Sequence, residues 1–136
     1  MSVRAALLLC FMTVLAGCVT SGNVDPMSTS KGRADARQAY VQLGVGYLQQ
    51  GQTERAKVPL KKALELDDSD ADANAALALV FQVEMESELA DKHFQKALSA
   101  RKGDARILNN YGSFLYEQKR YKEAYARFEE AAADNL

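Results

Sequence analysis

Few side chains in this sequence could perform acid–base, nucleophilic or metal chemistry. The chain of 136 residues has one histidine, His93, and two cysteines, Cys10 and Cys18. A zinc site needs three or four histidine, cysteine or acidic ligands at suitable spacing, and we find no such cluster in the sequence. Glycine-rich phosphate loops, G-x-S-x-G and H-E-x-x-H motifs are also missing from it. The sequence therefore predicts no enzyme, no metal site, no cofactor and no small-molecule substrate.

The acidic residues do not change this conclusion. The segment 67–72 begins like a calcium loop when it is read from Asp68, but its sixth position is Ala73 instead of Gly and its twelfth is Leu79 instead of Glu. We expect these acids to cap the helix that follows and to favour its positive end. The pair Glu129-Glu130 is expected on a solvated helix face, where it is not placed for acid–base catalysis.

Cys18 ends a short apolar segment at the N-terminus. Residues 5–16 are mostly apolar and follow one basic residue, Arg4, whereas a membrane-spanning helix needs roughly 20 apolar residues. This layout predicts a signal peptide over residues 1–17. The sequence "LAGC" at its end resembles the bacterial lipobox, in which the cysteine is acylated and becomes the first mature residue. The resemblance implies a lipid on Cys18, and Val19 in place of Asp after it favours the outer membrane, at its periplasmic face.

Two alternatives remain for this segment. An ordinary signal peptide could be cleaved after its small residues, with Cys18 incidental, and an uncleaved membrane anchor is disfavoured by the length of the apolar run. Residues 19–32 are polar and rich in Gly, Ser and Thr, which is typical of a linker. We therefore expect residues 18–34 to form a lipidated cysteine and a flexible tether. The net charge of −1 gives no electrostatic argument for a nucleic-acid partner, so membrane attachment would come from acyl chains.

From residue 35 the apolar spacing is helical, and the sequence repeats itself every 34 residues without an insertion. Each large position stays large and each small position stays small. The matching sets are Leu43, Leu77 and Tyr111; Gly44, Ala78 and Gly112; Tyr47, Phe81 and Leu115; Ala56, Ala90 and Ala124; Leu60, Phe94 and Phe128; and Ala63, Ala97 and Ala131. The small residues would let two antiparallel helices approach closely while the large ones fill the space between them.

This pattern resembles the tetratricopeptide repeat, although its first position is Tyr40, Asn74 or Leu108 instead of Trp. The resemblance implies an all-α solenoid of helix-turn-helix units over residues 35–136, with about three repeats at 37–70, 71–104 and 105–136. No polar capping helix follows the third repeat, so either the chain is part of a longer array, which we favour, or a partner covers that face.

Local signals add further expectations for the helix ends. We predict caps at Thr53 and Ser87 for the second helices, caps at Asp70 and Asp104 for the first helices, and a turn at Gly51. Pro59 lies inside a predicted helix and should bend it.

In such a solenoid the first helix of each repeat lines a concave wall. Helical spacing places an apolar patch with amide edges there, which suits an extended or helical peptide of a protein partner. The candidate partner-binding residues are Val41, Gln42, Val45, Leu48, Gln49, Leu79, Gln82, Asn109, Asn110 and Tyr116. The alternative for Val41, Val45 and Leu48 is that they only complete the core. Some repeats of this kind clamp a C-terminal carboxylate with Lys and Asn, but Val41 and Val45 occupy those places here.

The lipobox, the tether and the segments "YVQLGVGYLQQGQTERAKVPLKKAL" and "NNYGSFLYEQKRYKEAYARFEEA" together resemble the type IV pilus biogenesis lipoproteins with tetratricopeptide repeats, the PilF/PilW family. The resemblance implies a pilotin, which binds the pilus secretin and supports its outer-membrane localisation and multimerisation for pilus extrusion and twitching motility. Two alternatives stay open. One is a repeat lipoprotein scaffold for another envelope machine, such as outer-membrane protein assembly or cell-wall enzyme recruitment, and the other is the N-terminal part of an envelope enzyme.

Overall fold

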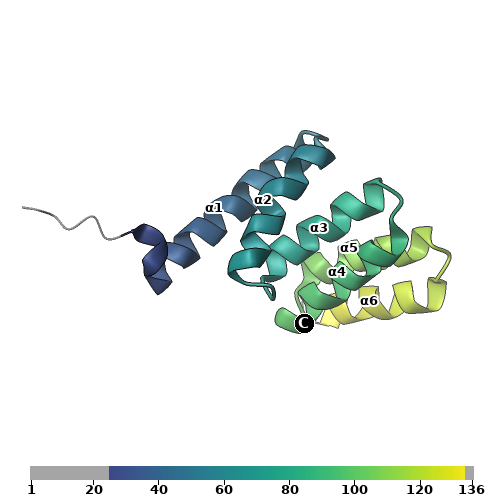
Figure 1. Cartoon of the computed structure of the whole chain (residues 1–136). Helices are drawn as coiled ribbons and strands as arrows, with labels where there is room; N and C mark the ends of the chain where they lie inside the picture. Colours follow the sequence, from purple (N-terminus) through teal and green to yellow (C-terminus); the bar gives the residue numbers. More distant parts are fainter. Residues whose placement is uncertain (1–24, 134–136) are drawn as a thin grey trace, which may run out of the picture.

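The computed structural model describes residues 25–133, in which six α-helices follow a short 3₁₀ turn at Pro26–Ser28 (Figure 1). The helices are α1 (Ser30–Gln49), α2 (Thr53–Leu66), α3 (Ala71–Val83), α4 (Ser87–Ala100), α5 (Ala105–Glu117) and α6 (Tyr121–Ala133). The described residues contain no strand. The second helices begin at Thr53, Ser87 and Tyr121, which are 34 residues apart, so the predicted all-α repeat fold is confirmed.

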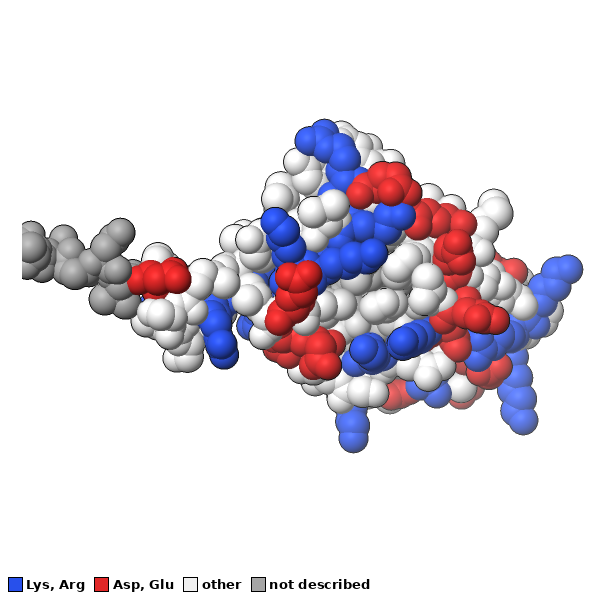
Figure 2. Space-filling model, in the orientation of Figure 1, with Lys and Arg blue, Asp and Glu red and all other residues white. Residues whose placement is uncertain are grey.

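The helices form three antiparallel pairs that stack along one direction (Figure 1). α2 also packs on α3 and α4 on α5, while α1, α3 and α5 adjoin along one side of the stack. Lys, Arg, Asp and Glu side chains are spread over the face of the molecule in Figure 2. None of the helices in the described part of the chain has the length and apolar character needed to cross a membrane.

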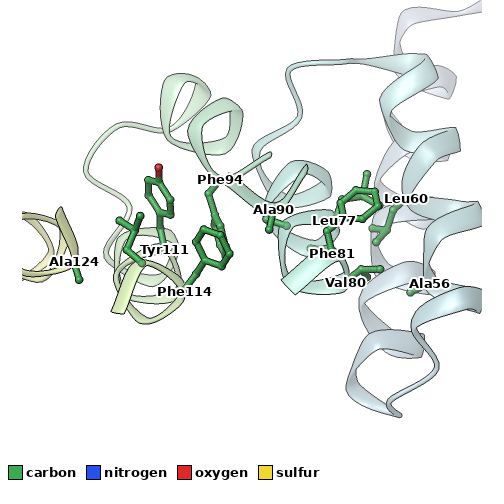
Figure 3. Packing of buried hydrophobic residues seen from close by; sticks show 13 residues of the cluster. Ala56, Leu60, Leu77, Val80, Phe81, Ala90, Phe94, Tyr111, Phe114 and Ala124 are labelled. Carbon is green, nitrogen blue, oxygen red and sulfur yellow. The ribbon is translucent and has the colours of Figure 1, made fainter. Parts of the chain in front are cut away.

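The larger core cluster runs through the stack (Figure 3), and Ala71, Ala75, Ala97 and Ile107 form a second, smaller cluster. Leu60, Leu77 and Phe94 are almost fully buried, and Phe94 stacks on Tyr111 with 5.1 Å between the ring centroids. The glycines of the repeat allow the close approach that the sequence predicted. A Cβ on Gly44 would collide with the side chain of Leu60, and one on Gly112 would lie 2.6 Å from the Phe128 ring. The core therefore depends on small residues at these two helix crossings.

The first helix begins earlier than the sequence predicted. α1 starts at Ser30, so residues 30–34 are helical and do not belong to a flexible tether. The Thr29 hydroxyl accepts a hydrogen bond from the Gly32 amide at 2.9 Å and caps the helix. Asp25 caps the preceding 3₁₀ turn in the same way by accepting from the Met27 amide at 3.0 Å. Two successive capping residues thus extend the ordered chain in a segment whose composition is typical of a linker. Residues 1–24, and with them the predicted signal peptide and Cys18, lie outside the described residues.

The predicted helix caps are correct for one set of helices and wrong for the other. Asp70 accepts from the Ala73 amide at 2.8 Å and Asp104 from the Ile107 amide at 3.1 Å, as expected. Thr53 and Ser87, in contrast, are already the first helical residues. The N-cap positions of α2 and α4 are Gln52 and Glu86, and neither side chain accepts a capping hydrogen bond. The tight hairpin decides this start, because the Gln52 amide already donates to the Tyr47 carbonyl of the preceding helix at 2.9 Å.

The three hairpins share a left-handed residue at the same repeat position. Gly51 has φ 73°, and Met85 and Lys119, its equivalents in the next two repeats, both have φ 61°. A left-handed backbone costs a non-glycine residue roughly 1–2 kcal/mol. Two of the three hairpins therefore carry backbone strain that the repeat geometry imposes.

Met85→Gly is expected to raise the free energy of unfolding by about 0.5–1 kcal/mol, because it relieves this strain and the Met85 side chain, 89% exposed, gives up little packing. The measurement is urea unfolding followed by circular dichroism. Gly51→Ala is the matched control: its Cβ would meet nothing within 4 Å, so only the backbone penalty acts and stability should fall. Unchanged stability in both variants would contradict the strain.

Pro59 and His93 occupy equivalent positions in the second helices of repeats one and two. α2 continues without interruption from Thr53 to Leu66 through the buried Pro59, and the predicted bend stays a prediction. His93 is half-buried, stacks on Phe81 and has its Nδ1 2.9 Å from Oδ1 of Asn74. Burial, together with Lys96, Lys92 and Lys61, lowers the pKa of His93 to about 4, so the ring is neutral at pH 7. His93 is thus a structural residue of the repeat.

Candidate partner-binding groove

A groove lies along the side of the stack where the first helices adjoin. Its space measures about 660 Å³. α1 supplies most of its wall, and α3 and α5 supply the rest. The lining residues are Val41, Gln42, Val45, Gly46, Leu48, Gln49, Asp72, Ala76, Leu79, Arg106 and Asn110. The groove therefore joins all three repeats on one surface.

The local sequence of α1 explains the apolar floor. Val41, Val45 and Leu48 are spaced by four and three residues, which places them on one face of the helix. All three are half-buried, and Val45 and Leu48 also pack against the core. The two interpretations are therefore compatible for Val45 and Leu48, which pack on the core and also line the groove, whereas Val41 lines the groove. Gly46 leaves the floor open, because a Cβ there would meet nothing within 4 Å.

The rim of the groove is polar, with the amides of Gln42, Gln49 and Asn110. One end carries a fixed charge arrangement. The Asp72 carboxylate accepts hydrogen bonds from Arg101 at 2.9 Å and from Arg106 at 2.6 Å. The hydrogen bond from Arg101 is the main cause that lowers the pKa of Asp72 below its ordinary value, so this acid is ionised at neutral pH. The arrangement can hold apolar side chains on the floor and pair polar groups at the rim.

The structure brings seven of the ten predicted groove residues together. These are Val41, Gln42, Val45, Leu48, Gln49, Leu79 and Asn110. The other three lie outside the groove lining. Gln82 donates to Glu117 at 2.7 Å, Tyr116 packs edge-on against Tyr121, and Asn109 is exposed.

Gly46, Asp72, Ala76 and Arg106 complete the lining although they are not among the ten candidates. The spacing of four residues between Gln42 and Gly46 could have identified the glycine from sequence. Repeat geometry also places Asp72, Ala76 and Arg106 on the concave wall, since Arg106 is the equivalent of Asp72 one repeat later. The ion pair between Asp72 and Arg106 could not be predicted in that way.

The acids of the segment 67–72 act in helix caps and ion pairs, and Asp67 and Asp70 share Arg37 as a partner. Asp67 accepts from Ser69 and pairs with Arg37, Asp70 caps α3, and Asp72 pairs with Arg101 and Arg106. Within residues 25–133 no group of three or more histidine, cysteine or acidic side chains could hold a metal ion. The segment therefore serves helix capping and repeat-to-repeat ion pairs.

These features define a tetratricopeptide-repeat protein, and the tetratricopeptide repeat family matches residues 38–70. The solved structure of the second repeat domain of Spaghetti (RPAP3), bound to an HSP90 peptide, has the same fold, with a TM-score of 0.67. It is 18% identical, and the match covers 76% of this chain and 97% of the other. MamA is 25% identical with a TM-score of 0.65, over 73% of this chain and 58% of its own. Repeats of this class are protein-binding scaffolds.

The chain is a homologue of PilF. It is 62% identical over all 136 residues to the type IV pilus assembly protein PilF of Pseudomonas aeruginosa, of which it covers 54%. The solved structure of that organism's PilF is 66% identical with a TM-score of 0.74, over 77% of this chain and 47% of the other. An uncharacterized protein of Haemophilus influenzae is 31% identical over 111 residues, or 82% of this chain and 62% of the relative. The chain thus spans about half the length of the curated relatives it matches, and the predicted family resemblance is confirmed.

Proposed function

We propose that this chain acts in type IV pilus biogenesis as a protein-binding scaffold without catalytic activity. The observation that carries the proposal is the 62% identity to PilF over the whole chain, together with a groove suited to a peptide.

The finer proposal is a pilotin. The client is the type IV pilus secretin, and the chain supports its localisation to the outer membrane and its multimerisation there. A lipid on Cys18 would hold the groove at the periplasmic face of that membrane, and stable anchoring needs more than one acyl chain. Tethering raises the effective concentration of the scaffold where the client arrives without any additional contact.

The groove itself is the proposed client site. A client segment would place apolar side chains over Val41, Val45 and Leu79, because these side chains form the floor. Its main-chain or side-chain polar groups would pair with the amides of Gln42, Gln49 and Asn110 at the rim. The charged pair at Asp72 and Arg106 marks one end of the groove and favours one orientation of the segment.

The cellular test compares heat-resistant secretin multimers in outer-membrane fractions from wild type, a deletion strain and Cys18→Ala. We expect multimers to be lost on deletion and to be mislocalised in the Cys18→Ala strain. Normal multimers in the correct membrane without the protein would overturn the pilotin proposal. In that case a repeat scaffold with another client would remain.

Gly46→Leu tests the groove directly. Because a Cβ at Gly46 meets nothing within 4 Å, the added side chain should occupy the groove without disturbing the helix pair. We expect at least about tenfold less secretin to co-purify with the variant, with unchanged helical circular dichroism; tenfold corresponds to about 1.4 kcal/mol. Val83→Leu, at an exposed position outside the groove lining, is the matched control. Wild-type secretin recovery with Gly46→Leu would remove the groove as the client site.

A further inference from the structure

The outer face of repeat one is an apolar surface on which no further helix of residues 25–133 packs. The name outer face of repeat one refers to the shallow depression of about 300 Å³ between α1 and α2. It is lined by Tyr40, Leu43, Tyr47, Arg55, Val58 and Lys62. Leu43 is 49% exposed, whereas its equivalents Leu77 and Tyr111 are 1% and 6% exposed because the preceding repeat covers them. Val58 is 59% exposed on the same surface. The repeat architecture therefore leaves a stacking surface uncovered at this end of the described stack.

The charges of this face are of one sign. Arg55 lies over the Tyr47 ring at 4.3 Å from its centroid and donates to the Tyr47 hydroxyl at 2.9 Å. Lys62 lies over the Tyr40 ring at 5.5 Å. The lining contains no acidic residue, and neither cation forms a salt bridge with a carboxylate of residues 25–133.

Nearby cations behave differently. Lys57, also on α2, pairs with Glu54 at 2.8 Å and with Glu84 at 2.9 Å, and it faces repeat two. Arg37, on α1, pairs with Asp67 and Asp70. Lys and Arg side chains are visible over α2 in Figure 2. Arg55 and Lys62 thus lie over tyrosine rings of the outer face, while Lys57 and Arg37 form ion pairs that serve packing between helices and repeats.

We propose that the outer face of repeat one lies against an anionic phospholipid surface. Tyrosine rings with apolar neighbours suit the boundary between headgroups and acyl chains. Each Lys or Arg near an anionic membrane surface contributes about 1 kcal/mol to the free energy of membrane binding. Lipid would then cover this face in the way that the preceding repeat covers Leu77 and Tyr111. The surface is distinct from the partner-binding groove, which remains open for a client.

The position of the face in the chain supports this occupant. α1, which carries Tyr40 and Leu43, is the first helix after the proposed lipid anchor, and about seven peptide steps separate Cys18 from Asp25. Seven extended residues reach at most about 25 Å. The first repeat would therefore be held close to the membrane. This step rests on the anchor of the proposed function, whereas the chemistry of the face does not.

The experiment measures how close the face comes to lipid in the tethered chain. A hexahistidine segment replacing residues 1–18 holds the chain on vesicles that contain a nickel-chelating lipid, so the result does not depend on acylation of Cys18. Without residues 1–18 the chain has no cysteine, and Val58→Cys gives a single site for a fluorophore. Val83→Cys is the matched control, since Val58 and Val83 are 59% and 63% exposed. The vesicles contain phosphatidylglycerol with brominated acyl chains, which quench the fluorophore at short range.

We expect at least twofold stronger quenching at position 58 than at position 83 with phosphatidylglycerol, and equal, weak quenching with phosphatidylcholine alone. Arg55→Glu combined with Lys62→Glu should abolish the difference while the circular dichroism spectrum is retained. Equal quenching at both positions in phosphatidylglycerol, or a difference that survives the charge reversal, would overturn the proposal. Quenching at position 58 that becomes weaker as the protein concentration rises would overturn the proposal and indicate that a second copy of the chain covers the face. The secretin assay of the proposed function is independent of these results.

Discussion

Gly44→Ala is expected to destabilise the protein, and Gly46→Ala, two residues along the same helix, is expected to stabilise it. A Cβ on Gly44 would collide with Leu60, which is fully buried and cannot move aside, and would lie 3.3 Å from the backbone carbonyl of Ala56. Overpacking of this kind lowers the free energy of unfolding by about 1–3 kcal/mol. The better helix propensity of Ala offsets about 1 kcal/mol of that loss. At Gly46 only the propensity gain acts, because the Cβ meets nothing within 4 Å.

The two variants should therefore differ in free energy of unfolding by about 1–3 kcal/mol, because the gain in helix propensity is common to both. Urea denaturation measured by circular dichroism at a single protein concentration gives both values. Equal stabilities would mean that α1 and α2 are not in close contact at Gly44. That result would contradict the packing of the first repeat.

Asn74→Ala is expected to lower the free energy of unfolding by about 2–3 kcal/mol. Asn74 is fully buried, and its amide donates to the carbonyls of Asp68 at 3.1 Å and Asp70 at 2.9 Å while its Oδ1 lies 2.9 Å from His93. Removing the side chain leaves the Asp68 carbonyl and the His93 Nδ1 without these partners at a partly buried site. The substitution would loosen the turn between repeats one and two.

Asn109→Ala is the control for this prediction, because the side chain at position 109 is exposed and the change in helix propensity is the same. It should leave stability unchanged or raise it slightly. A second readout is hydrogen exchange at the backbone amide of residue 74, which donates to the Asp70 carbonyl at 3.0 Å and should exchange faster in Asn74→Ala than in wild type. Equal stabilities for Asn74→Ala and Asn109→Ala would show that the buried amide contributes nothing.

The partner-binding groove illustrates which parts of a site helical spacing can predict. Val41, Val45 and Leu48 follow from periodicity alone, because residues three and four apart share a face of any α-helix. Tyr116 and Asn109 obey the same spacing, yet they lie outside the groove lining. Spacing gives the direction of a side chain relative to its own helix. Where that direction points in the molecule depends on how each helix pair is rotated on the previous one.

The helix ends show a similar division. Asp70 and Asp104 are caps whose action is local, since each side chain bonds to an amide three residues later, and the sequence predicted both. Thr53 and Ser87 have the residue types of caps but are displaced by one residue, because the hairpin bonds of the preceding helix determine where α2 and α4 begin. The extension of α1 to Ser30 depends on the Thr29 cap, which lies in a segment that composition marks as a linker.

The sequence by itself determined the repeat, because a period of 34 residues with conserved large and small positions has few other physical solutions than stacked helix pairs. It also determined the close crossings at Gly44 and Gly112, where only the absence of a side chain permits contact. The tertiary structure alone decided that Arg106 meets Asp72 across two repeats and that Leu43 is uncovered while Leu77 is buried. The reason is that these properties belong to the stacking of one repeat on another, and identical positions in the repeat acquire different neighbours along the stack.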